Sequence, residues 1–266
     1  MDTNSNQARR VVIGITAHVD AGKTTLAEAM LYRTGRLRKL GRVDHGSAAM
    51  DSHLLERERG ITIFSSQAEL PIGDLEVTLL DTPGHVDFSA EMERTLSVLD
   101  YAILVISGAD GVQAHTRTLW RLLELYRIPT FLFVTKMDFG RCDRGQMMEH
   151  LRHELGEGCV DFTPADRERR MEQLATCRED ALEAYLDGGE VPYALVRQLV
   201  GRRLVFPCWF GSGLKLEGID EFLEGLARYV EPPVYPETFS ARVFKILRRF
   251  AADPKSNPPQ VLVVNM

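Results

Sequence analysis

Hydrophobic and polar positions divide most of the chain into alternating β-rich and helical segments. Short, nearly continuous apolar runs predict buried strands, and segments with apolar residues three or four positions apart predict helices. The predicted strands are residues 10–16, 101–107, 130–135 and 204–210, and the predicted helices are residues 22–34, 87–99, 115–126 and 216–229. Because near-continuous apolar strands alternate with helices, we expect an α/β fold, a mainly parallel sheet with helices on both faces.

Two early segments depart from this alternation. Residues 61–70 and 76–80 flank Pro71-Ile72-Gly73-Asp74, whose turn-forming residues predict a hairpin. Residues 36–59 are polar and show little periodicity, which predicts a long mobile loop. Long loops without secondary structure in compact domains are usually functional or disordered.

The second half contains a charged, helix-prone stretch. It predicts helices over residues 144–155, 166–186 and 191–200, which we interpret as a helical insertion at about 140–203 within a first domain of residues 1–235. Its charge runs, such as residues 167–170, are typical of a solvated face. The remaining residues, 236–266, are too few to bury a core of their own. We expect them to be the truncated start of a second, β-barrel-type domain or a disordered tail.

Composition narrows the class of protein. The chain has 266 residues, 44% hydrophobic and 26% charged, with a net charge of −6. This charge argues against direct binding of free nucleic acid, which needs a basic surface, but leaves open docking to a ribonucleoprotein through a local patch. The four cysteines lack the spacing of metal ligands, so we expect them to be reduced thiols. No apolar run has the length or position of a signal peptide or a membrane span, so we expect a cytoplasmic protein that does not contact membranes. We also expect a monomer.

The first candidate for chemistry follows the first predicted strand. A helix N-terminus behind backbone N–H groups makes an anion site, and Gly22 lets the chain pass close to a β-phosphate. Lys23 would place its ammonium between the β- and γ-phosphates, and the Thr24 hydroxyl would ligate Mg²⁺. Ala17 stands where the usual phosphate loop has glycine. The predicted phosphate-binding residues are His18, Val19, Asp20, Ala21, Gly22, Lys23, Thr24 and Thr25.

Two further segments would sense the γ-phosphate. Asp81 ends a predicted strand, where its carboxylate can hold Mg²⁺ through a water molecule. Gly84 can offer its N–H to the γ-phosphate and move away after hydrolysis. Thr62 lies in the predicted mobile loop, placed to ligate Mg²⁺ only when the γ-phosphate is present, which is the behaviour of an order–disorder switch.

The last two segments predict guanine recognition. Asp138 follows a buried strand, and its carboxylate can accept two hydrogen bonds, one from the N1–H and one from the exocyclic amine of guanine. Adenine does not present this pair of donors. The stem of Lys136 can lie against the base. Thr135 stands where asparagine is commoner, and keeps a hydroxyl that can tie loops together. After the last strand, backbone N–H groups of Ser212, Gly213 and Leu214 would lie near guanine O6, with Gly213 where alanine is usual.

These segments together resemble the translational GTPases. Ala-His-Val-Asp-Ala-Gly-Lys-Thr-Thr (residues 17–25), Glu-Arg-Glu-Arg-Gly-Ile-Thr-Ile (56–63) and Asp-Thr-Pro-Gly-His-Val-Asp-Phe (81–88) are similar to elongation factor G and its relatives. Alanine at position 17 is normal in that group. Residues 97–117 more closely resemble the tetracycline-resistance ribosomal protection proteins. The similarity covers residues 10 to about 247 and is weakest in the predicted insertion.

The resemblance implies a ribosome-activated GTPase with GTP or GDP and Mg²⁺ as ligands. It implies that His85 orients the attacking water, that Lys23 stabilises developing charge, and that the ribosome is the partner of the full-length protein. Residues 243–246 resemble the first strand of the family's second domain. Two alternatives stay open: an elongation factor G-type translocase, and a binding module that senses GTP and GDP without hydrolysis.

Overall fold

The computed structural model describes residues 9–38, 66–82, 89–139, 143–163, 167–233, 241–247 and 260–265. In this part of the chain, the main sheet contains β1 (Arg9–Ala17), β2 (Ser66–Ile72), β3 (Leu75–Asp81), β4 (Tyr101–Ser107), β5 (Thr130–Thr135), β6 (Cys159–Asp161) and β7 (Phe206–Phe210). The helices are α1 (Lys23–Arg33), α3 (Ser89–Leu96), α4 (Ala114–Leu125), α5 (Arg144–Leu155), α6 (Arg167–Cys177), α7 (Glu179–Gly188), α8 (Tyr193–Gly201) and α9 (Ile219–Tyr229).

The sheet has seven strands in the order β2-β3-β1-β4-β5-β7-β6. Only β2 is antiparallel to its neighbour within this sheet, and it forms the predicted hairpin with β3 around Gly73 and Asp74. The other neighbours are parallel, so the carboxyl ends of β1, β3, β4, β5 and β7 lie along one edge. In sheets of this kind, ligands bind at the carboxyl ends of the strands.

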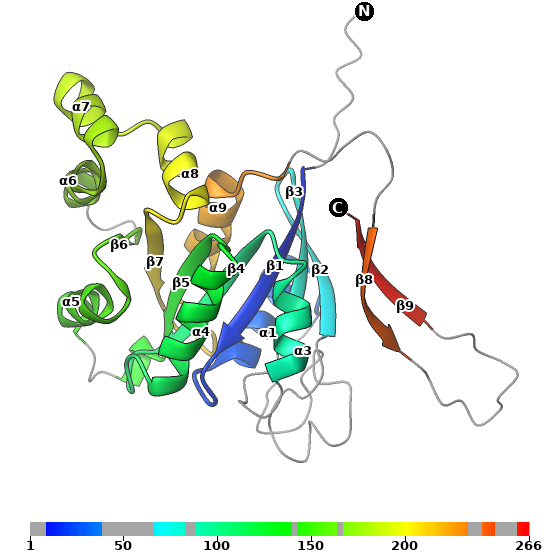
Figure 1. Cartoon of the computed structure of the whole chain (residues 1–266). Coiled ribbons are helices and arrows are strands. Elements are labelled where there is room, and N and C mark those ends of the chain that lie inside the picture. The colour runs from blue at the N-terminus through cyan, green and yellow to red at the C-terminus, as the bar shows by residue number, and fades with distance from the viewer. Residues whose placement is uncertain are drawn as a thin grey trace, which may run out of the picture.

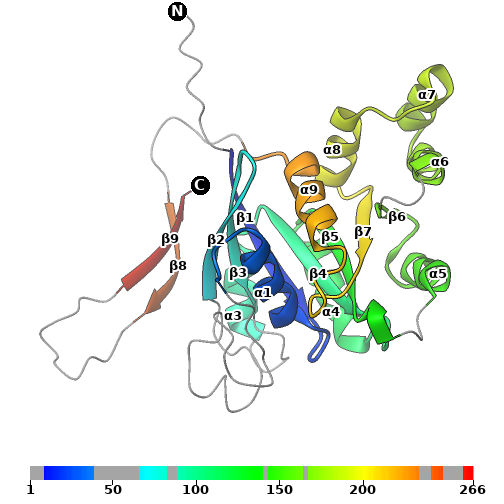
Figure 2. The same ribbon diagram turned by 180° about the vertical axis from the view of Figure 1, so that it is seen from behind.

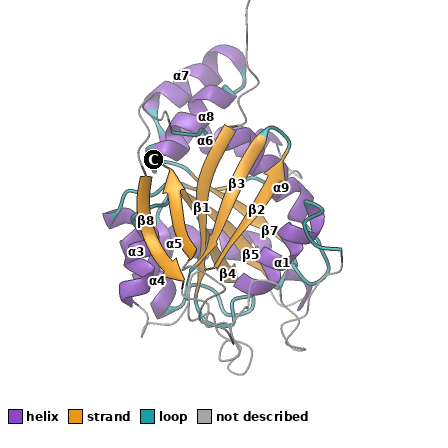
Figure 3. Ribbon diagram, turned by 90° about the vertical axis from the view of Figure 1, so that its right-hand side faces the viewer, coloured by secondary structure: helices purple, strands orange, loops and turns teal. Residues whose placement is uncertain are grey.

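Helices cover both faces of the sheet, as the sequence predicts. Alternate residues of β4 show this division: Ile103 packs in one buried cluster with α1 and α9, and Leu104 in a second cluster with α3, α4 and α5. Figure 1 shows α3 and α4 in front of the sheet, and the reverse view in Figure 2 shows α1 and α9 on the opposite face. Figure 3 shows the twist of the strands between these helical layers. The fold is therefore the mainly parallel α/β sheet expected.

The stretch predicted to contain only helices also carries a strand. After α5, β6 pairs in parallel with β7 and becomes the edge of the sheet, Cys159 lying opposite Phe206. The helix predicted over residues 166–186 is two helices, because Arg178 has extended backbone at the start of α7. The last group, α6 to α8, gathers beyond β6 and β7 (Figure 1) and shares the buried cluster of α9 through Leu174 and Val196. The division into domains remains a prediction.

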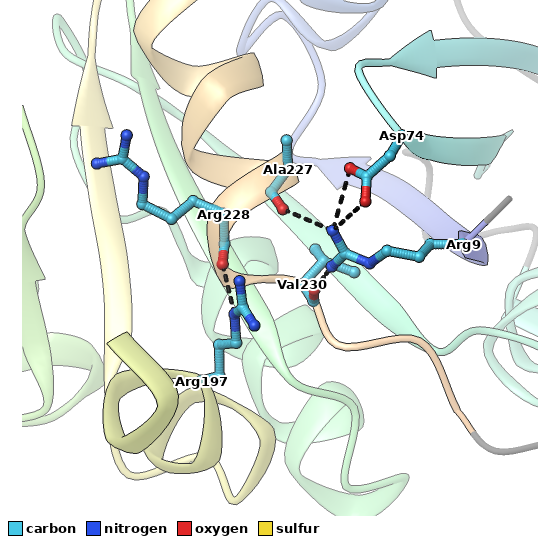
Figure 4. Close-up of polar contacts among 6 residues, drawn as sticks. All are labelled: Arg9, Asp74, Arg197, Ala227, Arg228 and Val230. Atoms are coloured by element: carbon cyan, nitrogen blue, oxygen red, sulfur yellow. Dashed lines mark hydrogen bonds and ion pairs between the residues drawn. The ribbon is translucent and has the colours of Figure 1, made fainter. Parts of the chain in front are cut away.

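Long-range contacts fix the end of α9. Arg9, at the start of β1, donates to the carbonyl oxygens of Ala227 at 3.2 Å and Val230 at 2.5 Å, and pairs with Asp74 at 3.2 Å (Figure 4). From the opposite side, the Nε atom of Arg197 donates to the carbonyl oxygen of Arg228 at 2.6 Å. These bonds satisfy carbonyl groups that a helix C-terminus leaves without intrahelical partners.

Two further strands follow, β8 (Ala241–Leu247) and β9 (Gln260–Asn265), which pair antiparallel with each other. Whether residues 236–266 begin a second domain or form a tail stays a prediction. No described helix has the length and apolar character needed to cross a membrane.

The cysteines behave as the sequence predicts where they are described. Cys159, Cys177 and Cys208 form no disulfide within this part of the chain, and Cys142 lies outside it. Burial raises the pKa of Cys177 to about 11. Burial also raises the pKa of Cys208 well above its ordinary value. Both side chains are therefore neutral thiols near neutral pH.

Candidate nucleotide-binding site

The loop between β1 and α1 has the backbone of an anion-binding site. Asp20 and Gly22 have positive φ angles of 60° and 90°, and the Ala21 N–H donates to the His18 carbonyl oxygen at 3.1 Å, which closes a tight turn. Gly22 is the N-cap of α1 and supplies no side chain to the helix, and the first turn of α1 carries no acidic residue. A helix N-terminus without a carboxylate of its own suits a bound anion.

Lys23 and Asp81 lie together at the ends of β1 and β3. The Lys23 ammonium contacts the Asp81 carboxylate and donates to the Thr82 carbonyl oxygen at 2.8 Å. The Lys23 side chain is 9% exposed and that of Asp81 is 0% exposed, so this ion pair is buried. Thr82 is held in turn, because its hydroxyl donates to the Ile15 carbonyl oxygen at 2.8 Å. The predicted cation of the phosphate loop therefore contacts a predicted magnesium ligand.

Thr135 joins the phosphate loop to the segment predicted to recognise guanine. Its buried hydroxyl lies 2.5 Å from the carbonyl oxygen of Ala21 and 3.2 Å from that of Ile106 in β4. A Cβ at Gly22 would lie 3.4 Å from the same hydroxyl oxygen. The sequence suggests that threonine at this position could tie loops together, and the structure confirms that role.

Thr135→Val is expected to destabilise the domain, because valine keeps the shape of the side chain but leaves a buried carbonyl oxygen without its hydroxyl donor. The expected loss in unfolding free energy is about 1–3 kcal/mol, measured by urea denaturation. Thr118→Val is a matched control, since the Thr118 hydroxyl is exposed on α4 and should change stability little. Equal urea midpoints for Thr135→Val and the parent would contradict this role of the hydroxyl.

Asp138 and the loop after β7 meet at the same edge. The Lys215 ammonium lies 3.6 Å from the Asp138 carboxylate, whose side chain is only 11% exposed. The Ser212 N–H donates to the Glu217 carbonyl oxygen at 3.0 Å, which occupies one of the backbone donors predicted for guanine O6. A Cβ at Gly213 would lie 3.1 Å from the Thr25 carbonyl oxygen in α1. This close approach explains why glycine is suited to a position where alanine is usual.

The structure thus brings together predicted residues from four separate segments: Lys23 with Asp81, Ala21 with Thr135, and Gly213 with Thr25. Thr62, Gly84 and His85 lie outside the described residues. Sequence reasoning missed Thr82 and Lys215, each of which directly follows a residue that was singled out. Within the described part of the chain, no group of three or more His, Cys, Asp and Glu residues forms an additional metal site.

Comparison with known proteins agrees with this geometry. Residues 8–232 match the family of the elongation factor Tu GTP-binding domain. The oxytetracycline resistance protein of Streptomyces rimosus is 41% identical over 89% of this chain and 40% of its own length. The tetracycline resistance protein TetO of Campylobacter jejuni is 35% identical over 88% of this chain and 39% of its own length.

A solved structure of a protein from Thermus thermophilus has the same fold. It superimposes with a TM-score of 0.81 at 28% sequence identity, covering 90% of this chain and 43% of that chain. The chain thus spans about two fifths of the length of the curated relatives it matches. Since the match extends over most of the chain and includes the phosphate loop and Asp138, the chain belongs to the elongation factor Tu GTP-binding domain family.

Proposed function

We propose that this chain is the GTP-binding and GTP-hydrolysing G domain of a ribosome-associated translation factor that resembles the tetracycline-resistance ribosomal protection proteins. One observation carries the proposal: four segments far apart in the sequence meet at the carboxyl edge of the sheet, linked by the contacts of Lys23, Thr135 and Asp138. The names of the similar proteins support the drug-resistance class. Because those proteins are longer than this chain, our proposal assigns ribosome binding to the whole protein and not to this chain alone.

The phosphates of the nucleotide would lie at the N-terminus of α1. Because Lys23 contacts Asp81 in this structure, binding requires its ammonium to exchange a carboxylate oxygen for phosphate oxygens. The base would be held by Asp138 and by the stem of Lys136, with N–H donors to guanine O6 from Gly213 and Leu214. The Ser212 N–H is already bonded to Glu217, so Ser212 would support the loop rather than contact the base.

Magnesium fits the donors of this site. Hydroxyl and carboxylate oxygens are the ligands that Mg²⁺ prefers, and the Thr24 hydroxyl and the Asp81 carboxylate would hold it, joined by Thr62 in the GTP-bound state. Bound Mg²⁺ neutralises charge on the β- and γ-phosphates. Lys23 would stabilise the charge that develops there as water attacks the γ-phosphate in line.

The nucleotide test is a calorimetric titration of the chain with GDP, GTP, ADP and ATP in the presence of Mg²⁺. We expect binding of both guanine nucleotides and at least tenfold weaker binding of both adenine nucleotides, since a buried carboxylate that is left unpaired costs about 1–3 kcal/mol. Equal affinity for ATP and GTP would overturn the proposal. A single-turnover hydrolysis assay on the full-length protein, with and without ribosomes, separates a GTPase from a module that only binds.

His85→Ala is expected to leave GDP and GTP affinity unchanged and to abolish ribosome-stimulated hydrolysis. His85 directly follows Gly84 in the sequence, and our proposal is that it orients the attacking water only in the activated state. A group that acts only in the transition state changes turnover and not ground-state binding. The measurement needs the full-length protein with ribosomes, and equal turnover by variant and parent would rule out the role.

A further inference from the structure

A pocket of about 640 Å³ lies near the amino-terminal ends of β5 and β7, away from the nucleotide loops. Arginines from two chain segments gather around it: Arg127 follows α4, and Arg202 and Arg203 follow α8. The other lining residues are Trp120, Glu124, Leu155, Gly201 and Phe206. Its surroundings are thus more basic than a chain of net charge −6 would suggest.

Two of these arginines occupy the same unusual backbone position. Arg127 and Arg203 have φ angles of 54° and 59°, in the left-handed region that helix ends normally reserve for glycine. In both cases the hydrogen bonds are those of a Schellman cap. For α4, the Arg127 N–H donates to the Glu124 carbonyl oxygen and the Ile128 N–H to that of Leu123, both at 2.9 Å. Two helices that border one pocket therefore both carry arginine where glycine would fit the backbone better.

Packing explains one of these arginines. The Arg203 guanidinium lies 5.0 Å from the ring centroid of Trp120 and 5.1 Å from that of Phe206, and it donates to the Thr130 hydroxyl at 2.9 Å. It therefore builds the wall of the pocket. Arg127 and Arg202 are exposed, and neither side chain has a hydrogen-bond or ion-pair partner among the described residues. Strained residues that local packing does not explain are concentrated at binding sites.

The lining residues indicate the class of ligand. Guanidinium groups bind carboxylates and phosphates with two parallel hydrogen bonds. Glu124, exposed in the same pocket, would repel a continuous polyanion but can accept a hydrogen bond from an amide N–H. Trp120 is covered by Arg203 and contacts the edge of Phe206 at 4.6 Å between centroids, so it offers no open face for stacking a nucleobase. Leu155 and Phe206 also line the pocket and supply its apolar surface.

We propose that this pocket binds an acidic peptide segment of a partner protein. Carboxylates of the segment would pair with Arg127 and Arg202, and a backbone N–H would donate to Glu124. The site lies apart from the nucleotide-binding residues, and the proposal stands whether or not the chain hydrolyses GTP.

The test is fluorescence anisotropy at low salt with a fluorescein-labelled peptide of alternating glutamate and leucine, about twelve residues long. Its glutamine version and a single-stranded RNA of similar length serve as comparison ligands. The proteins are the parent, Arg127→Gly/Arg202→Ala, and Arg10→Ala/Arg38→Ala as a control with the same loss of charge at two exposed arginines that do not line the pocket. We expect the double pocket variant to bind the acidic peptide at least tenfold more weakly than the parent. The control variant should stay within about twofold of the parent, because screened surface charges away from the site contribute little.

A stability measurement separates binding from structure. Arg127→Gly alone should weaken peptide binding and yet raise the melting temperature by about 2–4 °C, because glycine suits the left-handed cap. A lower melting temperature would show that Arg127 is retained for stability and would overturn the argument. The proposal also fails if the glutamine peptide binds equally well, if the double pocket variant binds like the parent, or if the RNA binds more tightly than the acidic peptide.

Discussion

Lys23→Ala is expected to weaken GDP binding by at least about tenfold to a hundredfold. The variant loses the cation of the phosphate loop, and a charge-assisted contact of this kind contributes about 1.5–3 kcal/mol or more. Calorimetric titration with GDP measures the loss. Unchanged affinity would show that Lys23 does not contact the phosphates. The proposed orientation of the nucleotide would then be wrong.

The buried ion pair adds a second effect to the same variant. Removing the ammonium leaves the fully buried Asp81 carboxylate without its cation, and breaking such a pair costs about 3–5 kcal/mol. The nucleotide-free variant should therefore unfold at a lower urea concentration than the parent. Lys23→Ala/Asp81→Asn removes the uncompensated charge, so it should recover part of the stability and none of the GDP affinity. If the double variant is no more stable than Lys23→Ala, the charge of Asp81 does not explain the instability.

Asp138→Asn is expected to change the preferred base from guanine to xanthine. Asp138 would accept hydrogen bonds from the N1–H and the amine of guanine, whereas xanthine carries a carbonyl in place of the amine and suits an amide donor. Each lost contact costs about 1–3 kcal/mol, so the parent should discriminate against xanthosine diphosphate by at least about tenfold. Competition binding with GDP, ADP and xanthosine diphosphate measures the change.

Lys215→Ala is the matched control for this experiment. It removes the ion pair with Asp138 without altering the carboxylate, and the Lys215 side chain is 53% exposed, so the pair should contribute little to stability. The control should keep its preference for GDP. If Asp138→Asn still prefers GDP, or if the parent binds ADP as well as GDP, Asp138 does not recognise guanine.

The sequence predicts those elements of the fold that are marked by their own residues, and misses those that depend on a distant partner. The bounds of β4 and β5 agree with the prediction to the residue, because both apolar runs end at a polar side chain, Ser107 or Thr135. The three-residue strand β6 was missed because it is too short to show periodicity. Its place as a strand depends on pairing with β7, where each partner lies 47 positions later, as in Cys159 with Phe206. The break between α6 and α7 at Arg178 carries no glycine or proline to mark it.

The site divides in the same way. The phosphate loop, Asp81 and Asp138 are local motifs whose spacing indicates their chemistry. The contacts between them are not local: Thr135 reaches Ala21 across 114 positions, and Lys23 reaches Asp81 across 58. Such distances in sequence carry no periodic signal, so only the parallel order of β3, β1, β4 and β5 explains why these residues meet.

The hydrogen bonds at the end of α9 also fix the direction in which the chain continues after this helix. Arg9 holds the carbonyl groups of Ala227 and Val230, and Tyr101 holds residue 231 through hydrogen bonds of 3.1 Å to the backbone of Glu231. Arg9 opens β1, and the other end of β1 leads into the phosphate loop. Strand β1 therefore connects the end of α9, which Arg9 contacts, with the loop that would bind the phosphates. A rigid fluorescent or spin label attached directly after residue 231 would therefore report the orientation of the main sheet, and not the motion of a flexible linker.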